Sequence, residues 1–192
     1  MRVGEPVVRP ERRQRVEGLP GRRREGDLQI NYTDDSLKVV CMIKVAIVDG
    51  DDSFHQRMRA LLESADGIMV VGGAKDGQEA IDLIREMRLE ARPDVILLEI
   101  GVPHASNLGT VAQICERFPQ ARIIVLHDEG QERRVLDAFR KGAQGHLVKG
   151  RAQPAEIVQA VRAVGRGEAI LSRHVAGRML DELIRKGKDR GV

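Results

Sequence analysis

The chain has 192 residues and a hydrophobic content of 42%, which suffices for one domain with a packed core and additional segments at its ends. Its formal charge of +3 is a small excess for this length and does not indicate a dedicated nucleic-acid-binding protein. The two cysteines, Cys41 and Cys115, form neither a CxxC motif nor a zinc-ligand spacing, and no apolar run is long enough to span a membrane. We therefore expect a cytoplasmic protein without disulfides, structural zinc or membrane contact.

Residues 1–41 have the composition of an unstructured extension. The first 26 residues hold eight arginines against four glutamates, together with three prolines, and show no hydrophobic period. This segment is interpreted as a solvated tail, as upstream sequence translated from an early start codon, or as a basic arm that contacts nucleic acid or acidic lipid. Met42 directly precedes the first apolar run and is a second candidate for the initiator residue.

From residue 42 to residue 171, short apolar runs alternate with segments of helical periodicity. The predicted strands cover residues 43–48, 68–71, 94–98, 121–126 and 145–148. Each segment between or after them has apolar residues at spacings of three and four, which gives a helix one face for a sheet. Helix starts are indicated by Ser53 and Asp76, each three residues before a Gln or Glu, and by Pro154. This alternation predicts an α/β domain with a five-stranded parallel sheet and helices on both of its faces.

Residues 172–192 are expected to form a C-terminal helix followed by a charged tail. Ser172 is the predicted N-cap, and the helix is expected to end near Lys186. Apolar residues recur on one side of this helix: Val175, Met179, Leu180, Leu183 and Ile184. One side of the helix should therefore pack against a protein surface.

Charged and polar residues follow four of the five predicted strands. The first strand is followed by Asp49, Gly50 and Asp51, and the third, fourth and fifth end in Glu99, His127 and Lys149. The carboxyl ends of parallel strands lie at one edge of the sheet, where open α/β sheets place their binding sites. We therefore expect these side chains to meet at one rim.

Several segments resemble the motifs of response-regulator receiver domains. They are Val45–Asp49, Pro93–Glu99 with Pro103 four residues on, and Gly142–Lys149, while Ala163–Ser172 resembles the receiver-to-linker segment of the NarL/FixJ subfamily. The resemblance implies a flavodoxin-like, doubly wound sheet of strand order 2-1-3-4-5 and a role in two-component (phosphorelay) signal transduction rather than an enzyme. Members of this subfamily usually continue into a helix-turn-helix domain, which we expect this chain to lack.

The resemblance also implies a phosphorylation site, and this chain departs from it. In the family, two acids after the first strand and an Asp after the third hold Mg²⁺, and that last Asp accepts the phosphoryl group. Asp49 matches the first acid, Gly50 replaces the second, and Glu99 stands at the acceptor position. The extra methylene of Glu moves its carboxylate by about 1.5 Å, whereas a shift of about 1 Å can cost roughly a hundredfold in rate. Mg²⁺ binding remains possible but weakened, and Asp51 is expected to cap the first helix more than to replace the missing ligand.

The two positions that switch in the family also differ in this chain. His127 stands at the position of the family's Ser or Thr, and His146 at the position of its aromatic residue. An imidazole here could bind an anion or respond to pH, or it could simply be solvated. Lys149 is kept and is expected to form an ion pair with Glu99. These departures favour a degenerate receiver, or pseudo-receiver.

Four functional hypotheses remain open at this point. The leading one is a phosphorylation-independent module for protein interaction or dimerisation, which contacts its partner through the fourth and fifth helices and the strand between them, with positive charge from Arg133, Arg134 and Arg140. A second keeps Glu99 as a phosphoryl acceptor, with a histidine kinase or acetyl phosphate as donor. A third is a nucleic-acid binder that uses the Arg-rich arm, and nucleic acid is the less expected partner. A fourth is the remnant of a transcription regulator that lost its DNA-binding half.

Overall fold

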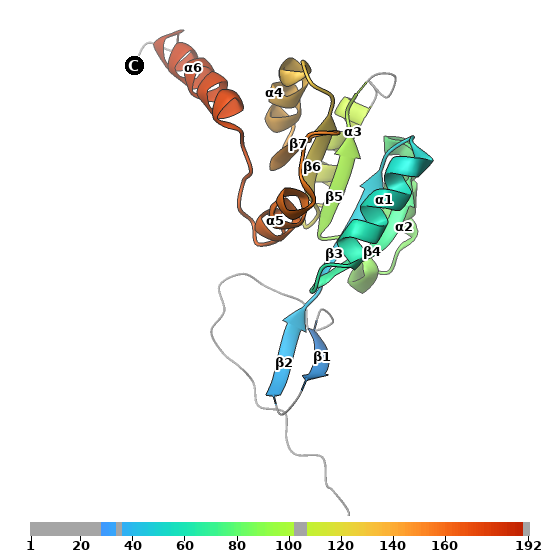
Figure 1. Ribbon diagram of the computed structural model, residues 1–192. Coiled ribbons are helices and arrows are strands. Elements are labelled where there is room, and N and C mark those ends of the chain that lie inside the picture. Colours follow the sequence, from blue (N-terminus) through green and yellow to red (C-terminus); the bar gives the residue numbers. More distant parts are fainter. Residues whose placement is uncertain (1–27, 34–35, 102–106, 190–192) are drawn as a thin grey trace, which may run out of the picture.

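The structure is a computed structural model that describes residues 28–33, 36–101 and 107–189 (Figure 1). Its centre is a five-stranded parallel sheet of order β4-β3-β5-β6-β7. The strands are β3 (Ile43–Val48), β4 (Ile68–Ala74), β5 (Val95–Glu99), β6 (Arg122–His127) and β7 (Gly145–Val148). When only these five strands are numbered in chain order, this is the predicted flavodoxin-like order 2-1-3-4-5.

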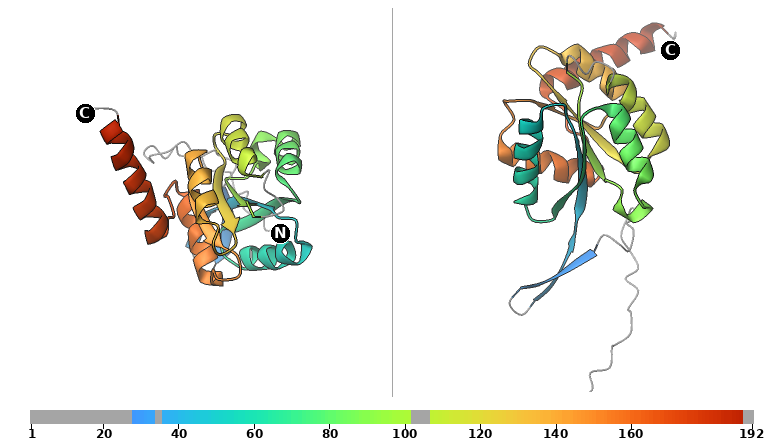
Figure 2. Two further views of the ribbon diagram at one scale, coloured as in Figure 1. Left: turned by 90° about the horizontal axis from the view of Figure 1, so that it is seen from above. Right: turned by 90° about the vertical axis from the view of Figure 1, so that its right-hand side faces the viewer.

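Helices cover both faces of this sheet. They are α1 (Asp52–Glu63), α2 (Gly77–Glu86), α3 (Asn107–Arg117), α4 (Glu132–Arg140) and α5 (Pro154–Gly165), with a 3-10 turn at Leu89–Ala91. Successive side chains of a strand point to opposite faces. In β5, Ile96 and Leu98 belong to the core under α2, α3 and α4, whereas Val95 and Leu97 belong to the core under α1 and α5. The right-hand view of Figure 2 shows these two layers on either side of the sheet.

The helix starts are fixed by local hydrogen bonds, and one of them differs from the prediction. Asp76 caps α2, because its carboxylate accepts from the backbone N–H groups of Gln78 and Glu79. Pro154 is the first residue of α5. Both starts were predicted. For α1 the start signal at Ser53 was placed two residues too late: the N-cap is Asp51, which was also expected to cap this helix, and its carboxylate accepts from the backbone N–H groups of Ser53 and Phe54. An acid at this position also meets the positive end of the helix dipole.

Part of the segment expected to be unstructured is a hairpin. Strand β1 (Leu28–Thr33) pairs antiparallel with β2 (Ser36–Cys41), in place of the irregular chain expected up to residue 41. Apolar Leu28, Ile30 and Tyr32 alternate with polar residues, which is a strand pattern that the Arg-rich composition of the preceding residues obscures. Residues 1–27 lie outside the described part of the chain.

The chain after α5 runs along the edge of β7 and then enters α6 (Arg173–Asp189). The Ser172 side chain accepts from the Val175 N–H at 3.3 Å, as expected of the N-cap. Val175 is buried in the core and Met179 packs partly against it, whereas Leu180 is 59% exposed and Ile184 is also exposed. No helix within the described residues is long and apolar enough to cross a membrane.

Candidate functional site at the carboxyl ends of the strands

The parallel sheet brings the predicted polar residues to one rim. Asp49 directly follows β3, Glu99 ends β5, His127 ends β6 and Lys149 directly follows β7. The backbone N–H of Lys149 donates to the His127 carbonyl at 2.8 Å, which extends the β6–β7 ladder to the rim. Asp49, Glu99 and His127 are all buried, although their side chains are polar.

Lys149 binds both buried acids at once. Its Nζ lies 2.8 Å from Asp49 Oδ2 and 2.8 Å from Glu99 Oε1. The predicted Lys149–Glu99 ion pair is therefore present, and Asp49 joins it. The ammonium also lies over the ring of Phe54, 4.6 Å from its centre, where a cation–π interaction is favourable.

The protonation state of Lys149 follows from the charges around it. Burial alone would lower the pKa of Lys149, but the hydrogen bonds and charges of Asp49 and Glu99 outweigh it and raise that pKa. The ammonium therefore stays charged. Lys149 thus supplies one positive charge to two carboxylates in a site largely shielded from water.

Asp49 and Asp51 divide their tasks by hydrogen bonding. The second Asp49 oxygen, Oδ1, accepts from the backbone N–H of Asp51 at 2.9 Å. The Asp51 carboxylate is exposed and is used in the α1 cap, where the N–H of Phe54 is the main cause of its lowered pKa. Gly50 between them has no side chain to offer. Asp51 is therefore a helix cap, as its position before α1 predicted.

These donors fit Mg²⁺ poorly. A Mg²⁺ site needs near-octahedral oxygen donors at short distance, usually with one or two carboxylates free to coordinate. Here the Lys149 ammonium takes one oxygen from each of Asp49 and Glu99, and the acid expected at position 50 is a glycine. No group of three or more His, Cys, Asp or Glu suited to a metal ion exists among the described residues.

The two histidines form a buried hydrogen-bonded chain that ends at α6. His127 Nε2 lies 3.1 Å from His146 Nδ1, and His146 Nε2 accepts from the Ser172 backbone N–H at 3.0 Å. An amide N–H can only donate, so neutral His146 carries its proton on Nδ1, and this N–H donates a hydrogen bond to His127 Nε2. His127 Nδ1 then donates to the Asp128 carbonyl at 2.8 Å.

This chain fixes the neutral form of His146. Burial, and the nearby His127, lower the pKa of His146 to about 4. Adding a proton to its Nε2 would also place two N–H groups against each other at Ser172. The switch positions therefore connect the rim of the sheet to the N-cap of the C-terminal helix.

Asn107 was not singled out from the sequence, yet it supports the site. It is 1% exposed, and its Nδ2 donates to the Glu99 carbonyl at 2.8 Å while its Oδ1 accepts from the Gly77 N–H at 2.9 Å. One side chain thus joins the end of β5 to the start of α2. An Asn near the start of a helix is ordinarily interpreted as a local cap. Nothing in the sequence therefore indicated the contacts of Asn107 with Glu99 and Gly77.

The remaining predicted features lie at the edge of the site or outside it. Arg133 and Arg140 are exposed on α4, and Arg134 is half-buried. Pro103, which belongs to one of the motifs, lies outside the described residues.

The comparisons with known proteins agree with this architecture. Residues 45–162 match the family of response regulator receiver domains. The chain is 32% identical over 148 residues to the transcriptional regulatory protein LiaR of Bacillus subtilis, which covers 77% of this chain and 68% of LiaR. It is 29% identical over 128 residues to the nitrate/nitrite response regulator protein NarL of Escherichia coli, which covers 67% of this chain and 57% of NarL. The chain thus spans roughly three fifths to two thirds of these curated relatives.

A solved structure gives the same result for the fold. The crystal structure of a LuxR-family two-component response regulator from Aurantimonas sp. SI85-9A1 superimposes with a TM-score of 0.63 at 28% sequence identity. The match covers 74% of this chain and 99% of that chain. With this sheet order and a family match over more than half of its length, the chain belongs to the response-regulator receiver domains of two-component signalling, with NarL- and LuxR-family regulators among its relatives.

Proposed function

We propose that this receiver domain signals without phosphorylation and acts as a protein-interaction or dimerisation module. The observation that carries the proposal is the position of Lys149 Nζ, 2.8 Å from the carboxylates of both Asp49 and Glu99. The ammonium lies between the two acids and supplies a positive charge to both of them. An acidic rim held in this way has little need of a divalent cation.

The acceptor position supports the same reading. Glu99 is 7% exposed and one of its carboxylate oxygens is already held by Lys149. To accept a phosphoryl group, Glu99 would have to give up this contact and reach a donor from a carboxylate about 1.5 Å further from the backbone than that of Asp, and displacements of this size cost orders of magnitude in rate. We therefore propose that Mg²⁺ binds weakly and that Glu99 has a structural role.

The receiver family acts through contacts with histidine kinases and other proteins. We propose that this chain keeps the contacts with other proteins and has lost the phosphorylation. The face of α4, β7 and α5 is the candidate surface, because His146 in β7 is bonded to His127 behind it and to Ser172 beyond it. Exposed Arg133 and Arg140 give this face positive charge, so an acidic surface on the partner would complement it.

A second candidate is a working phosphorylated switch with Glu99 as acceptor. The retained Asp49 and Lys149, both in contact with one another, favour it. LiaR is a transcriptional regulatory protein, and a role in the control of transcription is compatible with either candidate. The missing acid at Gly50 and the imidazole of His127 count against the switch.

Intact-mass spectrometry separates the two candidates. The full chain is incubated with acetyl phosphate and Mg²⁺, beside the variant Gly50→Asp/Glu99→Asp as a positive control. We expect the control alone to gain the mass of one phosphoryl group. If the wild-type chain is modified to a similar extent and mapping places the group on Glu99, the proposed function is wrong and the chain is a phosphorylated switch.

A further inference from the structure

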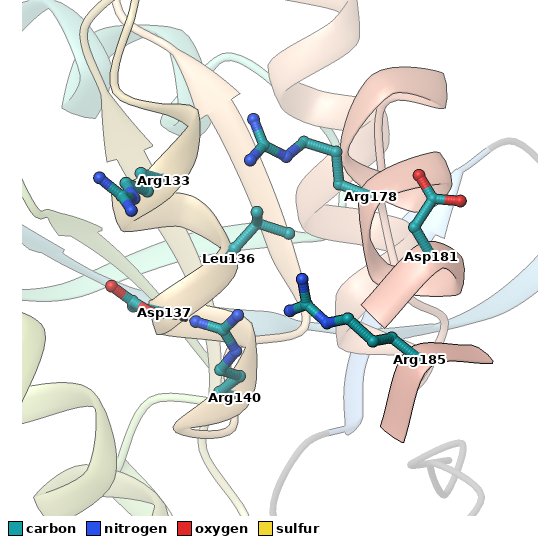
Figure 3. Close-up of a pocket in the computed structure, with 7 residues that line it drawn as sticks. All are labelled: Arg133, Leu136, Asp137, Arg140, Arg178, Asp181 and Arg185. Carbon is teal, nitrogen blue, oxygen red and sulfur yellow. Dashed lines mark hydrogen bonds and ion pairs between the residues drawn. The ribbon is translucent and has the colours of Figure 1, made fainter. Parts of the chain in front are cut away.

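A charged groove lies between α4 and α6, away from the rim of the sheet (Figure 3). Its volume is about 540 Å³, which is within the range of small-ligand sites. Seven residues line it: Arg133, Leu136, Asp137, Arg140, Arg178, Asp181 and Arg185. All of them come from the two helices.

The two helices present the same spacing of arginines to the groove. Arg133 and Arg140 on α4 are seven residues apart, and so are Arg178 and Arg185 on α6. Seven residues make about two turns, so each pair lies on one face of its helix with a rise of about 10 Å between its members. In Figure 3 the guanidinium groups of Arg178 and Arg185 reach from α6 toward α4.

The groove carries an excess of positive charge. Four guanidinium groups face two carboxylates, and one of these, Asp137, is bonded to Arg140. Arg133, Arg178 and Arg185 form no ion pair with any side chain that the structure describes. Like charges on two facing helices repel one another, and an anion between them would convert this repulsion into attraction.

We propose that this groove binds a linear oligophosphate that bridges α4 and α6. Arginine forks match the oxygen pairs of phosphate groups and bind them by two parallel hydrogen bonds. The spacing along each helix favours an elongated ligand with several charges over a single phosphate ion, because only the former contacts both arginine pairs at once. Leu136 is the sole apolar residue among the seven, so the groove offers neither a stacking surface for a nucleobase nor an apolar pocket to anchor a peptide side chain.

Binding of such a ligand would hold α6 on α4. The contact between these helices depends on the first turns of α6, where Val175 is buried, whereas Leu180 and Ile184 further along are exposed. The groove arginines of α6 extend into this outer part. An oligophosphate would therefore fix the outer part of the helix, where Leu180 and Ile184 are exposed. This inference does not depend on whether Glu99 is phosphorylated.

The test is a titration of the full chain with sodium tripolyphosphate in Mg²⁺-free buffer at a constant ionic strength of about 0.15 M, where nonspecific attraction is screened. Isothermal titration calorimetry gives the affinity, and thermal unfolding gives the stabilisation that binding to the folded state must cause. We expect saturable binding of one tripolyphosphate per chain. The variant Arg178→Glu/Arg185→Glu should weaken it by at least about tenfold, since each lost charge-assisted contact is worth about that much.

A control with the same change in net charge keeps the proposal falsifiable. Arg88→Glu/Arg173→Glu alters two exposed arginines outside the groove, one of them on α6 itself, and should bind like the wild type. Arg133→Glu, on the other wall, repeats the test if the α6 variant does not fold. An equal loss of affinity in the control, or the absence of saturable binding, would each overturn the proposal.

Discussion

Replacing Lys149 by methionine tests the charge cluster on which the proposed function rests. Methionine keeps an unbranched apolar chain of similar volume and removes only the ammonium. Asp49 and Glu99 would then remain 1% and 7% exposed, facing each other without a counter-charge. Removal of one partner of a buried ion pair costs about 3–5 kcal/mol, because the other charge stays buried and uncompensated. The Lys149 side chain is 15% exposed, which places this case at the lower end, about 3 kcal/mol.

The pH dependence of this loss has a defined sign. The two carboxylates of the variant can relieve their repulsion by binding a proton, so the folded variant takes up protons more readily than its unfolded chain. The stability deficit relative to the wild type should therefore be largest at neutral pH and shrink as the solution is acidified. The triple variant Asp49→Asn/Glu99→Gln/Lys149→Met carries no charge in the cluster and should recover most of the loss.

Urea unfolding followed by circular dichroism at pH 7 and pH 5 measures these differences as shifts of the midpoint at unchanged slope. If Lys149→Met lies within about 1 kcal/mol of the wild type, the ammonium does not hold the two acids in place. If the single and triple variants are equally unstable, the loss comes from packing and not from charge. Either result would refute the reasoning.

Three further predictions concern residues around the site. His146 has a folded pKa of about 4 against an ordinary value of 6.5, so acid should destabilise the protein from about pH 6.5 downward, by up to about 2 kcal/mol near pH 4 after allowance for solvent screening; His146→Phe should flatten this part of a stability–pH profile. Asn107→Ala leaves two buried backbone groups without a partner and should cost about 2 kcal/mol in urea unfolding, and a loss below about 0.5 kcal/mol would contradict this role. Gly77→Ala places a Cβ against the Thr110 side chain and should lower the melting temperature, whereas Gly109→Ala in α3 meets nothing within 4 Å and should raise it slightly; equal effects would show that the close approach at Gly77 is relieved by local movement.

The sequence by itself determined the fold and which side chains lie at the carboxyl ends of the strands. Buried parallel strands appear as continuous apolar runs, and such runs at β3, β5 and β6 are recognisable without any tertiary information. The rule that parallel strands end at one edge then placed Asp49, Glu99 and Lys149 together, although 100 residues separate the first from the last. Local start signals such as the Asp76 cap of α2 and Pro154 in the first turn of α5 were equally readable, because they act within one turn of the helix.

Only the tertiary structure decided which partners these side chains choose. Whether Lys149 binds Glu99 alone or Asp49 as well depends on distances set by the twist of the sheet, and no spacing in the sequence encodes them. The links from His127 through His146 to Ser172 require a particular tautomer and the course of the chain after α5. The groove between α4 and α6 likewise exists because two helices that α5 separates in the chain face one another, with Val175 of α6 packed into the core. The periodicity of apolar residues predicts which side of a helix is buried. The element against which that side packs depends on the packing of the whole domain.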